Sequence, residues 1–340
     1  MVQGAFPTFG REGTHMLNHA TDISRRTFVG TGLAASAALV LTACSGDGAP
    51  SPTASSGDVS TSSATKIDTD AFNGLVASGI VADDTTIAAS SWAQAIKDRG
   101  TLLLGGVETS TLFSQLDDTD GKDYGFDAGL AQLLTRYVLG DADRYTLTQV
   151  TSDTRESVLQ NGQVDCVFAT YSITDDRKRV ISFAGPYYES RQGILVAQDN
   201  TDINGIEDLA GKNVAVQSGS TGPDLLSEAA PDAKQQLFQT SSEAEEALSQ
   251  GRVDAYAFDL TLLESVVAQQ PESFKIVGEP FGTVDPYGIG LPLGSDGVSF
   301  VNDFLQKVED DGTWAKLWQI AIGDRTNQST APEPPQVGKA

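Results

Sequence analysis

Across residues 91–322, short apolar runs alternate with segments of helical periodicity. The apolar runs that predict strands are 101–107, 145–151, 164–170, 213–217, 252–258 and 287–291. The longest stretches with apolar residues at helical spacing are 126–138 and 298–322. This alternation predicts an α/β fold in which mostly parallel sheets are flanked by helices, and about 230 residues suit two small lobes better than one.

The charge balance excludes one class of partner. The chain of 340 residues has 22 Lys plus Arg against 46 Asp plus Glu, a formal net charge of -24. Because such an acidic surface repels nucleic acid and anionic lipid, we expect no nucleic-acid partner. The sequence also lacks an apolar run of the roughly 18 residues that a bilayer-spanning helix needs.

The first 43 residues have the order of an export signal. Arg25 and Arg26 precede a Gly- and Ala-rich apolar stretch, 28–43, which ends in Leu-Thr-Ala before Cys44. This resembles a twin-arginine signal peptide followed by a bacterial lipobox, with Met1 or Met16 as the start. The resemblance implies a lipid on Cys44; the alternative is a buried Ala-rich helix with an accidental Arg pair. If Cys44 is acylated, Cys166 has no partner and should be a buried thiol in a strand.

Three further segments flank the expected folded body. Residues 44–65 would comprise the lipidated cysteine and a flexible Ser/Thr/Pro tether, because their composition cannot bury surface. Residues 66–91 form an N-terminal extension that could contain one short helix packed on the body, and we assign it no function. The proline-containing segment 323–340 is predicted to be a disordered tail.

Several kinds of chemistry lack the residues they need. His15 and His19 are the only histidines, and both lie in or before the expected signal. The sequence has no Walker A motif, no Gly-x-Ser-x-Gly elbow, no zinc-binding cysteine cluster and no dinucleotide fingerprint. Acidic residues 117–123 resemble a calcium loop, but Ala128 stands where the twelfth-position glutamate is required, so a solvated loop is favoured. We therefore expect no metal, no cofactor and no enzyme activity.

Polar groups at the ends of predicted strands are the candidates for ligand binding. Thr170, Ser172 and Arg177 follow the third strand, where hydroxyls, free amides and a guanidinium could enclose a carboxylate. Alternatively, Thr174 caps a short helix and Arg177 is a surface charge.

In the second half of the chain, Ser220 and Thr221 lie where a strand turns into a helix. Exposed amides there could receive an anion, or either residue could be an ordinary helix cap. Asp259 ends a later strand and could pair with a ligand ammonium or cap the helix that follows. In open α/β sheets such strand ends are where ligands bind.

A set of short motifs runs in the same order through most of the body. They are GFD at 125–127, NGQVD at 161–165, ATYSITDDR at 169–177, FAGPY at 183–187, QSGST at 217–221, GRVDAYAFD at 251–259, PYGI at 286–289 and DGTW at 311–314. Together they resemble the extracytoplasmic solute-binding proteins of polar amino-acid ABC transporters, bacterial solute-binding protein family 3, and most closely the glutamate-binding lipoproteins.

The resemblance implies a type II periplasmic-binding-protein-like fold. Lobe 1 would comprise 92–193 plus 284–322, lobe 2 would comprise 194–283, and two hinge strands would join them. Arg177, with Ser172 and Thr170, would hold the ligand's α-carboxylate. From lobe 2, the Thr221 amide beside Ser220 would contact the same carboxylate, and Asp259 would take the α-ammonium.

Side-chain preference depends on Arg155. The segment 151–155 looks like that of the glutamate and aspartate branch, in which an arginine meets the distal carboxylate, although Arg155 could instead lie on the exposed face of its helix. An unpaired buried arginine would penalise neutral ligands. Glu108 departs from the family pattern: if it faced the pocket, glutamine or a cationic amino acid would become possible.

The resemblance therefore implies a monomeric lipoprotein on the outer face of the bacterial cell membrane. It would capture L-glutamate, or aspartate, and deliver it to ABC permease subunits in the membrane. The alternatives are a binding protein for glutamine or another polar amino acid, a sensor on the same fold, and a cyclohexadienyl-dehydratase-like or lyase-like enzyme with Glu108 as its acid or base.

Overall fold

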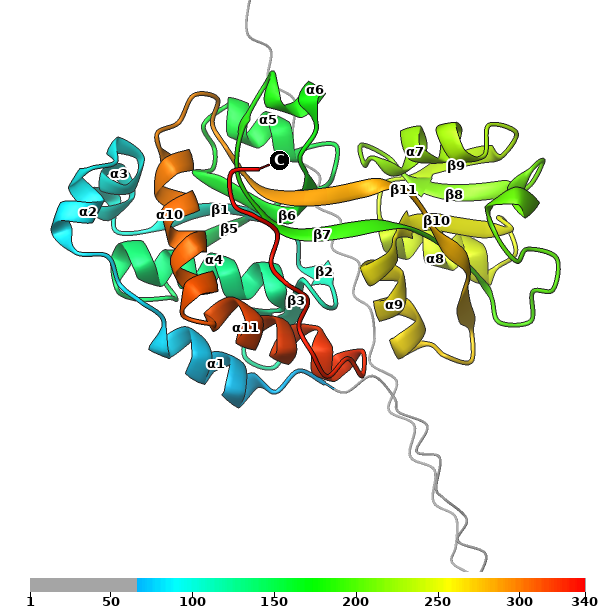
Figure 1. Cartoon of the computed structure of the whole chain (residues 1–340), viewed down its shortest axis with the longest axis horizontal. Coiled ribbons are helices and arrows are strands. Elements are labelled where there is room, and N and C mark those ends of the chain that lie inside the picture. Colours follow the sequence, from blue (N-terminus) through cyan, green and yellow to red (C-terminus); the bar gives the residue numbers. More distant parts are fainter. Residues whose placement is uncertain (1–65, 340) are drawn as a thin grey trace, which may run out of the picture. The chain divides into compact units, whose positions relative to one another are not determined.

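The computed structural model describes residues 66–339, and its central feature is an eight-stranded sheet in the order β5-β1-β6-β11-β7-β10-β8-β9 (Figure 1). The strands are β1 (Leu102–Gly106), β5 (Tyr145–Gln149), β6 (Cys166–Ser172), β7 (Ser182–Ala197), β8 (Asn213–Gln217), β9 (Lys234–Phe238), β10 (Ala255–Asp259) and β11 (Phe274–Leu291). β5, β1 and β6 are parallel, and so are β10, β8 and β9. The two parallel groups are joined by β7 and β11, which pair antiparallel with each other and with their neighbours.

We call the part built on β1, β5 and β6 lobe 1, and the part built on β8, β9 and β10 lobe 2. β7 and β11 run side by side between them as hinge strands (Figure 1). The helices of lobe 1 are α1 (Thr69–Ser78), α2 (Asp84–Ala88), α3 (Ser91–Arg99), α4 (Phe126–Leu139), α5 (Arg155–Gln160), α6 (Asp175–Lys178), α10 (Gly297–Asp310) and α11 (Thr313–Ala321). Those of lobe 2 are the 3-10 turn η1 (Ile206–Leu209), α7 (Gly222–Ala229), α8 (Ser241–Ser249) and α9 (Leu260–Gln269). The predicted two-lobed α/β fold of type II is confirmed.

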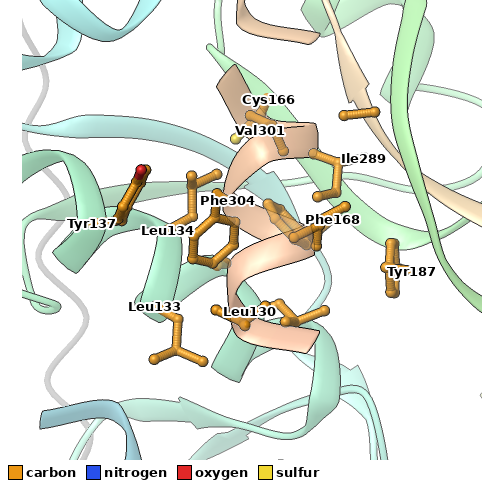
Figure 2. Close-up of a cluster of buried hydrophobic side chains, with 14 of the residues drawn as sticks. Leu130, Leu133, Leu134, Tyr137, Cys166, Phe168, Tyr187, Ile289, Val301 and Phe304 are labelled. Carbon is orange, nitrogen blue, oxygen red and sulfur yellow. The ribbon is translucent and has the colours of Figure 1, made fainter. Parts of the chain in front are cut away.

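The core of lobe 1 forms where α4 and α10 cover the sheet. Leu130, Leu134 and Tyr137 recur at helical spacing along α4 and are buried, in a helix of which nearly every residue is buried (Figure 2). They meet Phe304 of α10 and Phe168 of β6 in one cluster. Helix α4 ends at Gly140, whose φ of 77° gives the left-handed turn that glycine adopts without strain. Cys166 is fully buried in β6, as predicted.

Lobe 2 has two smaller cores, one on each face of its half-sheet. Val214 and Val216 of β8 point into one cluster, whereas Ala215 between them belongs to the other. This alternation is the period-2 pattern of a strand covered on both sides. Helix α7 packs in the first cluster through Leu226, and α8 in the second through Leu248.

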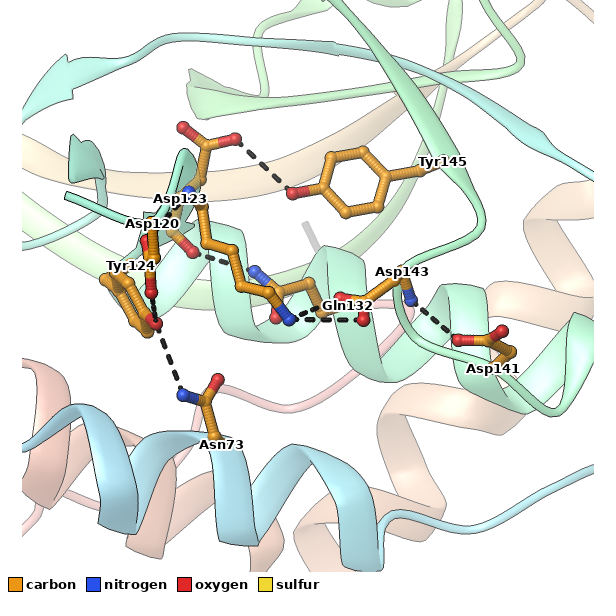
Figure 3. A network of polar contacts seen from close by, with 9 residues as sticks. Asn73, Asp120, Asp123, Tyr124, Gln132, Asp141, Asp143 and Tyr145 are labelled. Carbon is orange, nitrogen blue, oxygen red and sulfur yellow. Dashed lines mark hydrogen bonds and ion pairs between the residues drawn. The ribbon is translucent and has the colours of Figure 1, made fainter. Parts of the chain in front are cut away.

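The N-terminal extension belongs to lobe 1 and contains two helices, α1 and α2, where one was expected. Phe72 of α1 is fully buried in the lobe 1 core. Asn73 Nδ2 donates to Tyr124 Oη at 3.2 Å, and Tyr124 Oη donates to Asp120 at 2.6 Å (Figure 3). Tyr124 lies in a small sheet of β2 (Thr109–Ser110), β3 (Ser114–Asp117) and β4 (Lys122–Tyr124), so α1 is fastened to that sheet as well as to the core.

Two expectations for the C-terminal region are wrong. The single helix predicted over 298–322 is two helices, because the chain turns at Gly312, which has a φ of 76°. The tail is not a disordered segment: Ala331 and Val337 pack against the lobe 1 core, and the Gly338 amide donates to the Gly185 carbonyl at 2.8 Å. Two apolar contacts and a backbone hydrogen bond hold a segment that its proline content suggested would stay free.

No helix within residues 66–339 is long and apolar enough to cross a bilayer. The expected signal peptide 1–43, Cys44 and the tether up to residue 65 lie outside the described residues.

Candidate functional site

A cavity of about 370 Å³ lies between the lobes. Lobe 1 contributes Val107, Thr109–Thr111, Gln115, Val150–Ser152, Arg155, Ala169 and Thr170, and lobe 2 contributes Gln217, Gln239–Ser242, Glu245, Phe258, Leu262, Ser265, Val266, Gln269 and Gln270. The wall is mostly hydroxyl and amide side chains, with one cation, Arg155, and one anion, Glu245. A cavity of this kind suits a small polar solute that carries charge.

Arg155 is the first residue of α5 and points inward, so the alternative of an exposed helix face is excluded. Its side chain is buried, Nη1 donates to the Ala169 carbonyl at 2.9 Å, and its Cζ lies 3.9 Å from the centre of the Tyr171 ring. Within residues 66–339, its buried Nε has no hydrogen-bond partner. Burial, and next the neighbouring Arg177 guanidinium, lower the pKa of Arg155 to about 10. The charged guanidinium of Arg155 therefore lies at the cavity wall, and its Nε–H donor lacks an acceptor within residues 66–339.

Thr170 also lines the cavity, and its backbone is held in a rare conformation. Its φ is 42°, which few residues other than glycine adopt. The Thr170 amide donates to Asp127 Oδ2 at 2.8 Å, while Tyr187 Oη donates to Asp127 Oδ1 at 2.7 Å. Asp127 is fully buried, and this burial raises its pKa to about 6. The carboxylate of α4 thus fixes the strand end that faces the cavity.

Arg177 joins the two lobes. It is almost fully buried on α6, and Nη1 donates to the Ser172 carbonyl of its own lobe at 2.9 Å. Nη2 donates to the Gly219 carbonyl of lobe 2 at 2.8 Å. The cap at Thr174 is present too, since Thr174 Oγ1 accepts from the Arg177 amide at 3.3 Å. The surface-charge alternative for Arg177 is therefore wrong, although the capping part of it is confirmed.

Ser172 and Thr221 come together on a residue that sequence reasoning missed. Ser172 Oγ of lobe 1 donates to Asp285 Oδ2 at 3.0 Å, and Thr221 Oγ1 of lobe 2 donates to the same oxygen at 2.9 Å. Asp285 lies on hinge strand β11, and burial raises the pKa of its carboxyl. The only signal in the sequence is its position directly before the PYGI motif.

Asp259 has two neutral donors. Gln192 Nε2 donates to Oδ1 at 2.5 Å, and Tyr287 Oη donates to Oδ2 at 2.6 Å. Burial, and next the charge of Asp285, raise the pKa of Asp259 to about 7. In the part of the chain that the structure describes, neither aspartate forms an ion pair with a lysine or arginine. Two buried carboxylates without a partner cation are ready to receive an ammonium group.

Two other sequence candidates lie elsewhere. Ser220 is engaged within its own turn, because its Oγ donates to the Gln217 carbonyl at 2.8 Å and accepts from the Gly222 amide at 3.1 Å. Glu108 is half-buried and is not among the residues that line the cavity. Residues 66–339 contain no group of three His, Cys, Asp or Glu placed to hold a metal ion.

The predicted residues thus form two adjoining groups. Arg155 and Thr170 line the cavity, whereas Arg177, Ser172, Thr221 and Asp259 surround the closed junction of the lobes, with Asp285 at its centre. The Tyr171 ring links the groups, since its centre lies 3.9 Å from Arg155 Cζ and 5.2 Å from Arg177 Cζ. Both distances fall in the range of cation–π attraction. A solute that carries a positive and a negative charge close together would match this arrangement of arginines and aspartates.

Comparison with known proteins finds relatives that are named for the amino acid they bind. A glutamine-binding protein of an ABC transporter from Bacillus subtilis is 33% identical over 227 residues, 66% of this chain and 82% of that relative. A glutamate-binding protein from Corynebacterium glutamicum is 34% identical over 235 residues, 65% of this chain and 79% of that relative. The crystal structure of a solute receptor for L-cysteine from Neisseria gonorrhoeae, 24% identical, shares the fold with a TM-score of 0.67 and covers 71% of this chain and 97% of its own. Residues 103–323, most of the folded body, match the family model, and the chain belongs to the bacterial extracellular solute-binding proteins, family 3.

Proposed function

We propose that this chain is the solute-binding component of an amino-acid ABC importer and that its ligand is L-glutamate, or aspartate. The relatives named for glutamine and glutamate support an amino-acid ligand at this level of identity. The lobes would close over the solute and deliver it to a membrane permease, which is a binding function without catalysis.

The observation that carries the choice of glutamate is the buried Arg155 at the cavity wall. Its guanidinium makes one hydrogen bond with the residues that the structure describes, to Ala169, and leaves Nε without a partner. A distal carboxylate would supply the missing acceptor and the counter-charge in one group. A neutral side chain would leave the buried cation uncompensated, so it should bind less tightly.

The remaining groups would hold the amino-acid backbone of the ligand. Arg177, Ser172 and Thr170 of lobe 1 would take the α-carboxylate, with the Thr221 amide from lobe 2. The Asp259 carboxylate would take the α-ammonium in place of one of its neutral donors. Because the two lobes share this site, closure would depend on a ligand that has both charges.

The proposed location follows from the N-terminal sequence. We place the protein on the outer face of the bacterial membrane as a monomer, held by a lipid on Cys44 after removal of residues 1–43. Intact-mass measurement of the exported protein tests this proposal, since a chain that begins elsewhere or a Cys44 without lipid would overturn it.

Titration calorimetry of the purified chain with glutamate, aspartate, glutamine and arginine tests the ligand. We expect one-to-one binding in which glutamate is about tenfold or more tighter than glutamine, because a lost charge pair in a buried site costs at least this much. Arg155→Gln should remove most of that preference while leaving glutamine binding close to its original value. Arg179→Ala, which replaces an exposed arginine at the end of α6 that pairs with Asp176 and does not line the cavity, serves as the control and should change neither.

The outcomes separate two levels of the proposal. If glutamine binds as tightly as glutamate to the unaltered protein, the role of Arg155 is wrong. If no amino acid binds at all, the importer function itself is wrong.

A further inference from the structure

Asp285 connects the lobes through a single carboxylate oxygen. Oδ2 accepts one hydrogen bond from Ser172 Oγ in lobe 1 at 3.0 Å and another from Thr221 Oγ1 in lobe 2 at 2.9 Å. The residue is 5% exposed. Each hydroxyl has only one proton to donate, and both protons go to this carboxylate.

The position of Asp285 on the hinge explains how it reaches both lobes. It lies opposite Ser190 of β7, and the register of the two strands shifts between Phe281 and Asp285. Ser172 is the last residue of β6 in lobe 1, and Thr221 precedes α7 in lobe 2. A carboxylate at this point of β11 therefore reaches one hydroxyl from each lobe.

Nearby cations do not pair with Asp285. Arg177 directs Nη1 and Nη2 to the carbonyls of Ser172 and Gly219, and Arg155 directs Nη1 to the carbonyl of Ala169. The negative charge of Asp285 instead acts on Asp259, whose pKa it raises. The two hydroxyls are thus the hydrogen-bond donors that the structure gives Asp285 within residues 66–339.

We propose that Asp285 sets the affinity of the site by acting as an internal competitor of the ligand's α-carboxylate. This inference rests on the proposed function, in which the ligand carboxylate uses the Ser172 hydroxyl and approaches Thr221. One hydroxyl proton cannot serve two carboxylates at once, and two carboxylates in a buried site repel each other. The ligand must therefore displace Asp285 from these hydroxyls before the lobes can close around it.

The same contacts favour a closed arrangement without any solute. A carboxylate that holds Ser172 and Thr221 together stabilises the closed lobes by two charge-assisted hydrogen bonds. Any population held closed in this way is unable to admit a solute, which lowers the apparent affinity. Asp285 would thereby prevent the site from filling at low solute concentrations.

Asp285→Asn tests the proposal in the full chain, because asparagine keeps the size of the side chain and removes its charge. We expect glutamate to bind about tenfold tighter in calorimetry, since a competing bond to a charged group is lost. Small-angle X-ray scattering without amino acid should show a larger radius of gyration than for the unaltered chain. Asp224→Asn, an exposed aspartate in the first turn of α7, is the control and should change neither result.

Thr221→Val provides a second variant that keeps the backbone amide and the shape of the side chain. It removes one of the two bonds to Asp285, so both effects should appear in the same direction and be smaller. If Asp285→Asn does not fold, calorimetry and scattering of Thr221→Val alone test the proposal.

An affinity that stays the same or falls, or a radius of gyration that does not increase, overturns the proposal. Failure of the importer function is recognised separately. If the unaltered chain binds no amino acid, the scattering comparison still tests whether Asp285 holds the lobes together.

Discussion

The two ends of the interlobe site differ in how their arginines are satisfied. At the cavity end, Arg155 makes one hydrogen bond to its own lobe and has a buried Nε without a partner. At the junction end, Arg177 donates to one carbonyl in each lobe. The two buried guanidinium groups near the Tyr171 ring therefore differ: Arg155 has a free donor for the side chain of a solute, whereas Arg177 contacts both lobes.

Replacing Arg177, the arginine at the junction end, should have the largest effect on ligand affinity. Arg177→Ala removes both carbonyl contacts and the proposed partner of every α-carboxylate. We expect the affinity for all amino acids to fall by about 100-fold or more, because truncating a buried charged partner costs this much. Calorimetry with glutamate and glutamine measures it, and the two losses should be equal within error.

The contrast with Arg155→Gln gives the control for that result. Arg155→Gln should change the ratio of glutamate to glutamine affinity, whereas Arg177→Ala should leave the ratio unchanged and lower both values. If Arg177→Ala lowered the affinity for glutamate only, the separate roles proposed for Arg155 and Arg177 would be wrong.

A smaller effect should appear in the pH dependence of stability. The pKa of Asp259 is raised from 3.8 to about 7 in the folded chain, mainly by burial. Between these values the folded state binds more protons than the unfolded state, so this group's contribution to the free energy of unfolding falls as pH rises. The contribution is fully present below pH 3.8 and is lost as pH rises through about 7.

Thermal unfolding at pH 5 and pH 8 measures this effect. Asp259→Asn cannot titrate, so the difference in melting temperature between the two pH values should be smaller in the variant than in the unaltered chain. Asp224→Asn should keep the original difference. An unchanged pH dependence in Asp259→Asn would show that Asp259 is ionised throughout.

Much of the fold follows from patterns within single elements. The apolar run at 213–217 became β8 with the bounds that the sequence predicted, and the buried Cys166 was expected in its strand. Strand β11 was recognised only at 287–291, because Gly278, Pro280 and Gly282 interrupt its apolar pattern. Its other residues are held in the ladder by β7, whose paired residues lie more than 70 positions away in the sequence, and no local pattern reveals such a partner.

The candidate site, too, could be predicted from the sequence only in part. Arg155, Thr170, Ser172, Arg177, Thr221 and Asp259 were identified from motifs, and the structure places them around one interlobe region. Asp285 was missed because its importance lies in its contacts, with Ser172 at 113 positions and Thr221 at 64 positions along the chain. Likewise, the division into a cavity end and a junction end depends on Tyr171, to which the sequence analysis gave no role.

Both ends of the described chain pack on lobe 1, through Ile67 on one side and Val337 on the other. In the sequence, lobe 2 lies between β7 and β11, so neither end of the described residues belongs to it. A solid support or a fluorescent protein attached next to Ile67 or Val337 would therefore move with lobe 1 and leave lobe 2 unhindered. A biosensor built from this chain would need its second fluorophore in lobe 2, since a pair of labels near Ile67 and Val337 would keep a constant separation while the lobes move.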